Sequence, residues 1–241
     1  KIADEVGMTK VIKLAKEMGI STLTDQDYNL STALGGLTHG VTPLEMVQAY
    51  GVLANGGIKV QPTAILKIVD RNGQVVEENS IQEKRVVDEK DAAIITNMLE
   101  SVINGGTGGN AAIGRPAAGK TGTTDDSKDA WFVGYTPDLV AAVWIGDDYG
   151  SETLRGITGG DTPAIMWGQF MANALANTPA SDFPVPSSAQ SAIAEGYFNP
   201  VKVQPKKDDK KDDKADKKDD KDKQKDEKVK EDDQTSKEEV S

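Results

Sequence analysis

Apolar side chains recur three and four positions apart in four segments of the chain, a spacing that predicts four amphipathic helices. Each segment begins at a residue that can cap a helix: Thr9, Thr42, Asp88 and Asp161. The second helix has the strongest start, because Pro43 suits the first helical position and Glu45 can complete a capping box with Thr42. The apolar residues expected along the last helix are Ile165, Met166, Phe170, Met171 and Leu175.

Five shorter segments have the composition of β-strands: residues 63–70, 74–78, 117–124, 130–136 and 139–146. The first two flank the turn Arg71-Asn72-Gly73. The last two are joined by Thr136-Pro137-Asp138 and are expected to form a hairpin. The last three segments therefore predict a β-rich block late in the chain, and it follows a glycine-rich loop.

Charge divides the chain into a body and a tail. Residues 202–241 hold 14 Lys and 15 Asp or Glu with few apolar side chains, so they cannot bury enough surface to offset the entropy cost of ordering. We therefore expect a folded part at 1–178, an extended proline-rich linker at 179–201 and a disordered tail at 202–241. We expect the tail to be solvated, and a role in binding the cell wall or a protein partner stays open.

Residues 1–201 carry 14 basic and 24 acidic side chains, which gives a net charge of −10. An acidic body argues against nucleic acid as a partner, because phosphate binding requires a basic surface.

The absence of cysteine excludes disulfides and thiolate metal sites. No segment reaches the roughly 20 apolar residues of a membrane span. Because the chain begins with Lys1, we expect a truncated or processed N-terminus, with any signal or anchor lying upstream.

The segment with the clearest candidate chemistry is Lys120-Thr121-Gly122-Thr123. A Lys-Thr-Gly triplet on a strand is one of three local signatures of active-site-serine enzymes that act on β-lactams or peptidoglycan peptides. The Thr121 and Thr123 hydroxyls should lie on one face of the strand and donate to a substrate carboxylate. Gly122 would let the substrate backbone approach closely. Lys120 would add positive potential near the serine, and the Thr123 N–H could serve an oxyanion hole.

The two other signatures, Ser-x-x-Lys and Ser-x-Asn, occur nowhere in the 241 residues. The chain therefore carries a substrate-binding part of a site without the attacking hydroxyl, and we predict no nucleophile, cofactor or metal in it. His39, the only histidine, is expected to have a local structural role rather than to serve a catalytic triad. Asp125, Asp126 and Asp129 match no calcium loop and are expected to be solvated.

The same region also satisfies a competing pattern, because Gly114 to Thr121 has the form G-x-x-x-x-G-K-T of a phosphate-binding loop. Such a loop connects a strand to a helix whose N-terminus faces the phosphates. Here the residues after Thr121 are poor in helix formers, and an aromatic strand pattern follows them. We therefore favour the strand and keep a nucleotide-binding module as the alternative from another functional class.

Longer stretches resemble the C-terminal part of the transpeptidase domain of class A penicillin-binding proteins, the bifunctional peptidoglycan synthases. The stretches that carry the resemblance are residues 34–46, 106–108, 116–124 and 129–137. The resemblance extends from about Lys1 to about Leu175 and is absent from the charged tail. It implies an α+β fold of the serine transpeptidase and β-lactamase type, here partial, with the late antiparallel strands and their flanking helices.

The resemblance further implies a D,D-transpeptidase that crosslinks peptidoglycan stem peptides through an acyl-serine intermediate and binds penicillin. Lys120 would be a catalytic residue, and Thr121, Gly122 and Thr123 would bind a D-Ala-D-Ala peptide or a β-lactam. The parent protein would carry a glycosyltransferase domain and a membrane anchor upstream and act on the extracytoplasmic face, where cell-wall, division or elongation proteins could be partners. The alternative is a β-lactamase or D,D-carboxypeptidase of the same fold, and the isolated chain is expected to be inactive.

Overall fold

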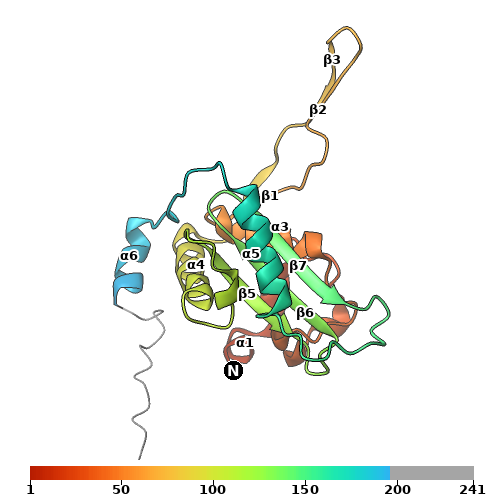
Figure 1. The fold of residues 1–241 in the computed structure, drawn as a ribbon, viewed down its shortest axis with the longest axis vertical. Coiled ribbons are helices and arrows are strands. Elements are labelled where there is room, and N and C mark those ends of the chain that lie inside the picture. Colours follow the sequence, from red (N-terminus) through yellow and green to blue (C-terminus); the bar gives the residue numbers. More distant parts are fainter. Residues whose placement is uncertain (196–241) are drawn as a thin grey trace, which may run out of the picture. The chain divides into compact units, whose positions relative to one another are not determined.

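The computed structural model describes residues 1–195, and their centre is a three-stranded antiparallel sheet (Figure 1). Its strands are β5 (Ala118–Thr123), β6 (Asp129–Tyr135) and β7 (Val140–Gly146), and they lie in that order. At the predicted turn between the last two, the Thr136 N–H donates to the Leu139 carbonyl oxygen at 2.9 Å. The prediction of three successive strands is therefore confirmed.

The four helices predicted from apolar spacing are present: α2 (Met8–Met18), α3 (Pro43–Ala54), α4 (Glu89–Ile103) and α5 (Thr162–Ala174). Thr42 and Asp88 cap α3 and α4 as predicted, since each side chain accepts a hydrogen bond from the first turn. The prediction that Thr9 caps a helix was wrong, because α2 begins directly after Gly7 and Thr9 lies inside its first turn. The remaining helical elements before β5 are short: α1 (Ile2–Val6), η1 (Asp25–Asp27), η2 (Leu30–Leu34) and η3 (Gly109–Ala111).

Helices cover both faces of the sheet, and two residues of β6 show which helix lies on which face. Phe132 and Tyr135 point to opposite faces, because side chains alternate along a strand. The Phe132 ring lies 5.2 Å from the Trp167 ring of α5. On the other face, Tyr135 Oη lies 2.9 Å from Thr96 Oγ1 of α4, and the Tyr135 ring packs edge-on against Tyr50 of α3. The sheet therefore lies between α5 and the pair formed by α3 and α4, an α+β arrangement (Figure 1).

The core between α5 and the sheet is built around Trp167 and Phe132, both of which are fully buried. Trp167 Nε1 donates to the carbonyl oxygens of Gly134 at 3.2 Å and Ala141 at 3.1 Å. A buried indole N–H needs such partners, because an unpaired polar group in an apolar core is costly. The two hydrogen bonds fix α5 across β6 and β7.

The predicted apolar positions of α5 divide into two groups. Met171 and Leu175 pack into the core with Trp167. Ile165, Met166 and Phe170 are 43%, 48% and 55% exposed, so they lie on the solvent side of the helix. The buried stripe of the helix consists of Ala164, Trp167, Met171 and Leu175. With 3.6 residues per turn, positions 165, 166 and 170 all lie outside that stripe.

Two short strand pairs lie outside the central sheet. The first, β1 (Ile58–Val60) with β4 (Glu83–Arg85), was not predicted. The second, β2 (Lys67–Val69) with β3 (Val75–Glu78), matches the two strands predicted around the Asn-Gly turn, although β2 is shorter than the expected 63–70. Every residue of β2 and β3 is exposed, and Figure 1 shows this hairpin extending away from the three-stranded sheet.

The segment predicted to be an extended proline-rich linker is described as far as residue 195. Residues 179–186 form no helix or strand, whereas residues 187–194 form a helix that packs against the body. The helix α6 (Ser187–Ala194) contacts α4, and its Ala189 is fully buried at that contact. Ahead of α6, the Phe183 ring packs edge-on against the Tyr135 ring with their centroids 5.5 Å apart. The chain after α5 therefore crosses to the face of the sheet that α3 and α4 cover.

The predicted tail at 202–241 lies outside the described residues. Within residues 1–195, no helix is both long enough and apolar enough to cross a membrane. The boundaries at 178 and 201 stay predictions, and α6 shows that the segment between them is in part helical.

A buried carboxylate ties the start of α3 to the loop after α2. Glu45 Oε1 accepts from the Ser21 N–H at 2.6 Å and from the Ser21 hydroxyl at 2.7 Å, while Glu45 Oε2 accepts from the Thr42 N–H at 2.9 Å. Thr42 Oγ1 in turn accepts from the Glu45 N–H at 3.2 Å, so the predicted capping box is confirmed. Burial acts to raise the Glu45 pKa, but the hydrogen bonds from Thr42 and Ser21 outweigh it and lower the pKa from 4.5 to about 2.

We expect Glu45→Gln to lower the free energy of unfolding by roughly 2–3 kcal/mol at pH 7. Because the folded-state pKa of about 2 lies below the pKa of 4.5 of an unperturbed glutamate, this stabilisation is present above pH 4.5 and is lost as the pH falls toward 2. Urea unfolding at pH 7 and near pH 2, in the protein that carries this segment, measures the effect. Glu77→Gln, on the exposed hairpin, is the matched control. An equal loss at both pH values would contradict the assignment.

Candidate functional site

β5 lies at one edge of the central sheet, and among the described residues it pairs only with β6. The Thr124 N–H donates to the Asp129 carbonyl oxygen at 3.1 Å, which makes these two residues a hydrogen-bonded pair. In an antiparallel pair, successive residues direct their backbone groups alternately toward the neighbouring strand and away from it. Gly122 therefore faces β6 with its N–H and C=O groups, whereas those of Thr121 and Thr123 point to the open edge.

The side chains of Thr121 and Thr123 lie on one face of β5, and each hydroxyl has a partner there. Thr107 Oγ1 lies 2.8 Å from Thr121 Oγ1. The Gly159 N–H donates to Thr123 Oγ1 at 3.0 Å. A threonine hydroxyl has one proton and two lone pairs, so each of these oxygens keeps hydrogen-bonding capacity for a ligand.

Lys120 brings a positive charge to the same edge. Its side chain is exposed, and its Nζ donates to the Thr121 carbonyl oxygen at 2.9 Å. Because that carbonyl is one of the groups that point to the open edge, the ammonium is held beside the edge. A negatively charged ligand lying along β5 would therefore meet an ammonium, two hydroxyls and the backbone N–H groups of Thr121 and Thr123, which point to the open edge.

The residues that precede α5 cover the hydroxyl-bearing face of β5. A Cβ atom on Gly159 would lie 2.3 Å from the Trp131 carbonyl oxygen and 2.5 Å from that of Gly122, so only glycine can approach the strands this closely. The Thr158 hydroxyl and N–H donate to Asp161 Oδ2 at 2.6 and 3.1 Å, and these hydrogen bonds lower the Asp161 pKa. The loop is thus closed on itself and held against β5. The role of Gly122 in substrate approach stays a prediction.

The other candidate residues are not part of this arrangement. His39, Asp125 and Asp126 are exposed. Asp129 Oδ1 accepts from Trp144 Nε1 at 2.9 Å, which gives this carboxylate a structural partner on β7. In the part of the chain that the structure describes, no group of three His, Cys, Asp or Glu side chains is placed to hold a metal ion.

The structure rules out the phosphate-loop interpretation. Lys120 and Thr121 lie inside β5, and the strand continues to Thr123 instead of turning into a helix. A turn then leads directly into β6. The first α-helix after Lys120 is α5, which begins only at Thr162. A loop that joins a strand to a helix N-terminus, which phosphate binding requires, is therefore absent at this position.

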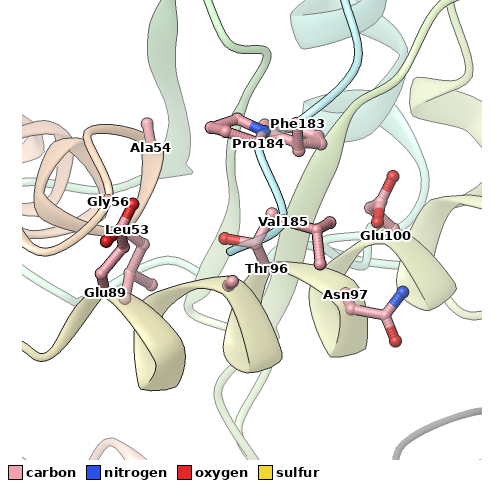
Figure 2. A pocket seen from close by; sticks show the side chains of 11 residues that line it. Leu53, Ala54, Gly56, Glu89, Thr96, Asn97, Glu100, Phe183, Pro184 and Val185 are labelled. Carbon is pink, nitrogen blue, oxygen red and sulfur yellow. The ribbon is translucent and has the colours of Figure 1, made fainter. Parts of the chain in front are cut away.

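A pocket lies away from this edge, between α4 and the segment before α6 (Figure 2). Thr96 and Glu100 line its helical side, and Phe183 lies opposite them. Burial raises the Glu100 pKa, and the nearby negative charge of Asp182 adds to the rise. No residue of β5 lines the pocket. We therefore regard the pocket as part of the contact between the C-terminal segment and α4, and not as part of the candidate site.

Sequence reasoning missed the two residues that contact the threonine hydroxyls. Thr107 lies 14 positions from Thr121, and Gly159 lies 36 positions from Thr123. Contacts over such separations depend on how α4 and α5 pack on the sheet, which no local pattern encodes. The available signals were the glycines that surround Thr107 and follow Thr158, and the family resemblance of residues 106–108.

Comparison with known proteins identifies the family of this chain. The family model described as the penicillin-binding protein transpeptidase domain matches residues 1–155. Penicillin-binding protein 1A of Aquifex aeolicus is 38% identical over 186 residues, which cover 77% of this chain and 25% of that protein. Penicillin-binding protein 2D of Bacillus subtilis is 40% identical over 190 residues, which cover 75% and 26%. The chain thus spans about a quarter of the length of these relatives.

Solved structures show the same fold. Penicillin-binding protein 1A from Haemophilus influenzae matches with a TM-score of 0.70 and 26% identity over 77% of this chain and 33% of that one. The PonA1 protein from Mycobacterium tuberculosis, in complex with penicillin V, matches with a TM-score of 0.63 and 32% identity over 70% and 50%. Since the family model covers more than half of the 241 residues, the chain belongs to the penicillin-binding protein transpeptidase domain family.

Proposed function

We propose that this chain supplies the substrate-binding edge of a serine D,D-transpeptidase whose nucleophile lies in another part of a longer protein. The observation that carries the proposal is the open edge of β5, where the Lys120 ammonium and the hydroxyl and backbone groups of Thr121 and Thr123 come together. Membership of the transpeptidase family supports it. The chain's share of its relatives, about a quarter, is consistent with a site completed by other segments.

The open edge suits a peptide that ends in a carboxylate. An extended peptide can add to an exposed strand edge through main-chain hydrogen bonds. The Thr121 and Thr123 hydroxyls would donate to the carboxylate, and the Lys120 charge would strengthen that binding. The Thr123 N–H, which points to the open edge, would stabilise the oxyanion that forms during acyl transfer.

In the proposed reaction, a serine hydroxyl attacks the carbonyl carbon between the two D-alanines. A serine ester forms, the amide C–N bond breaks, and the released D-Ala amine takes up the proton that the serine loses. An amine from a neighbouring stem peptide then attacks the ester, so that a new amide forms and the serine hydroxyl is regenerated. A β-lactam would undergo the first step alone, because its ring nitrogen stays attached after the ring opens.

We extend the proposal to the parent protein. Its ligands would be D-Ala-D-Ala stem peptides and β-lactams, and its site would face the extracytoplasmic side of a membrane to which another segment anchors it. The resemblance to the bifunctional peptidoglycan synthases implies a parent that also carries a glycosyltransferase domain, and we keep that domain as part of the proposal. Cell-wall, division or elongation proteins stay predicted partners.

We expect Lys120→Ala in the parent protein to lower the second-order rate constant of acylation by benzylpenicillin about a hundredfold or more, since charge stabilisation at the reacting group is lost. The protein should stay folded, because the Lys120 side chain is exposed. Labelling with a fluorescent penicillin measures the rate, and thermal unfolding checks the fold.

The control for this substitution is Lys84→Ala, which removes an exposed strand lysine on β4, outside the site. Its acylation rate should equal that of the unmodified protein. If Lys120→Ala were acylated at a near-normal rate, Lys120 would have no part in the chemistry.

We expect the isolated 241-residue chain to form no covalent adduct with penicillin, because it contains no Ser-x-x-Lys sequence. We also expect it not to unfold cooperatively, since the open edges of the sheet lack partner strands. Intact mass after incubation with benzylpenicillin tests the first expectation, with the parent protein as the positive control. An added mass equal to one penicillin would refute it.

A further inference from the structure

We infer that Thr107 is a positioning residue: its hydroxyl donates to Thr121 Oγ1 and thereby directs the Thr121 proton to a bound carboxylate. The two oxygens lie 2.8 Å apart, and either hydroxyl can act as the donor of this hydrogen bond. The inference rests on the proposed function, in which Thr121 binds the carboxylate of the substrate. It adds a residue from a different segment to that site.

Counting protons decides the direction of the hydrogen bond in the bound state. A carboxylate can only accept hydrogen bonds, and each threonine hydroxyl has one proton to donate. If Thr121 donates to the ligand, it has no proton left for Thr107. Thr107 must then be the donor, and the three groups form a chain from the Thr107 hydroxyl through the Thr121 hydroxyl to the carboxylate. Such a chain is cooperative, because each bond polarises the next.

Thr123 shows the same arrangement with a donor whose direction is fixed. A backbone N–H can only donate, and the Gly159 N–H donates to Thr123 Oγ1 at 3.0 Å. The Thr123 proton is therefore free for a ligand. Each of the two hydroxyls on this face of β5 thus has a donor within hydrogen-bond distance, Thr107 for Thr121 and Gly159 for Thr123. Such a donor can occupy a lone pair of the hydroxyl oxygen, which leaves the hydroxyl proton for a ligand at the open edge.

Close contacts hold Thr107 in place. A Cβ atom on Gly160 would lie 2.3 Å from the Thr107 carbonyl oxygen, and one on Gly108 would lie 2.8 Å from the Phe132 ring. Asn110 Nδ2 donates to the Gly160 carbonyl oxygen at 2.9 Å. This hydrogen bond joins the segment that contains Thr107 to the loop before α5. The Thr107 backbone is therefore held beside β5 before any ligand binds, which lowers the cost of ordering this residue on binding.

The test compares Thr107→Val with the unmodified parent protein, using benzylpenicillin and its methyl ester as probes. We expect the variant to be acylated about tenfold more slowly by the acid and less than about threefold more slowly by the ester, because hydrogen bonds to a charged acceptor are about twice as strong as those to a neutral one. Thr107→Ser, which keeps the hydroxyl, should restore the rate with the acid. In a Thr121→Val background, Thr107→Val should have no further effect.

Thr63→Val, which changes an exposed threonine before β2, is the matched control and should leave both rates unchanged. Thermal unfolding checks each variant, and Thr107→Ala replaces Thr107→Val if the latter does not fold. Equal slowing with acid and ester, or no slowing with either, would overturn the inference. Unchanged acylation in both Thr121→Val and Lys120→Ala would instead refute the proposed function, whatever Thr107 does.

Discussion

The docking of α5 on the sheet through Trp167 is the contact on which the geometry of the site depends. The indole N–H is shared between carbonyl oxygens of β6 and β7, and the ring packs on Phe132. This contact fixes the position of α5 on the sheet, and with it the position of the residues just before α5. One of them, Gly159, supplies the N–H that donates to Thr123 Oγ1. A core interaction on one side of β5 therefore determines how a hydroxyl at its open edge is presented.

The same packing explains why glycine precedes Lys120. A Cβ atom on Gly119 would lie 2.7 Å from the Phe132 ring, and one on its cross-strand partner Gly134 would lie 2.9 Å from the Trp167 ring. Both glycines make room for aromatic rings. The Gly-Lys-Thr sequence that matches a phosphate loop thus arises here from the packing of a sheet against a helix, with no phosphate involved. Phosphate binding and the packing of aromatic rings both require glycine at this position, so the same short sequence arises for two unrelated reasons.

The sequence predicted elements wherever a local signal was sufficient. The capping box at Thr42 located α3, and strand-like composition with the turn at 136–138 located β5, β6 and β7. It could not predict β1 and β4, because each has only three residues and their pairing spans a long insertion. It also did not predict which side of α5 is buried, because apolar residues occur around much of this helix and its packing on the sheet selects Trp167 and Met171. In the site, the strand that carries Lys120 was found from sequence, whereas its contacts with other segments required the tertiary fold.

The path of the chain after α5 affects where this domain can be cut. Arg115 donates to the carbonyl oxygens of Leu175 and Thr178 at 3.2 and 2.6 Å, and Phe183 then covers the Tyr135 ring on the opposite side of the sheet. An expressed form that stops at residue 178 would leave that ring, and the surface of α4 under α6, open to water. A stop after residue 195 keeps these side chains covered, so the recombinant boundary belongs beyond α6 rather than at Pro179.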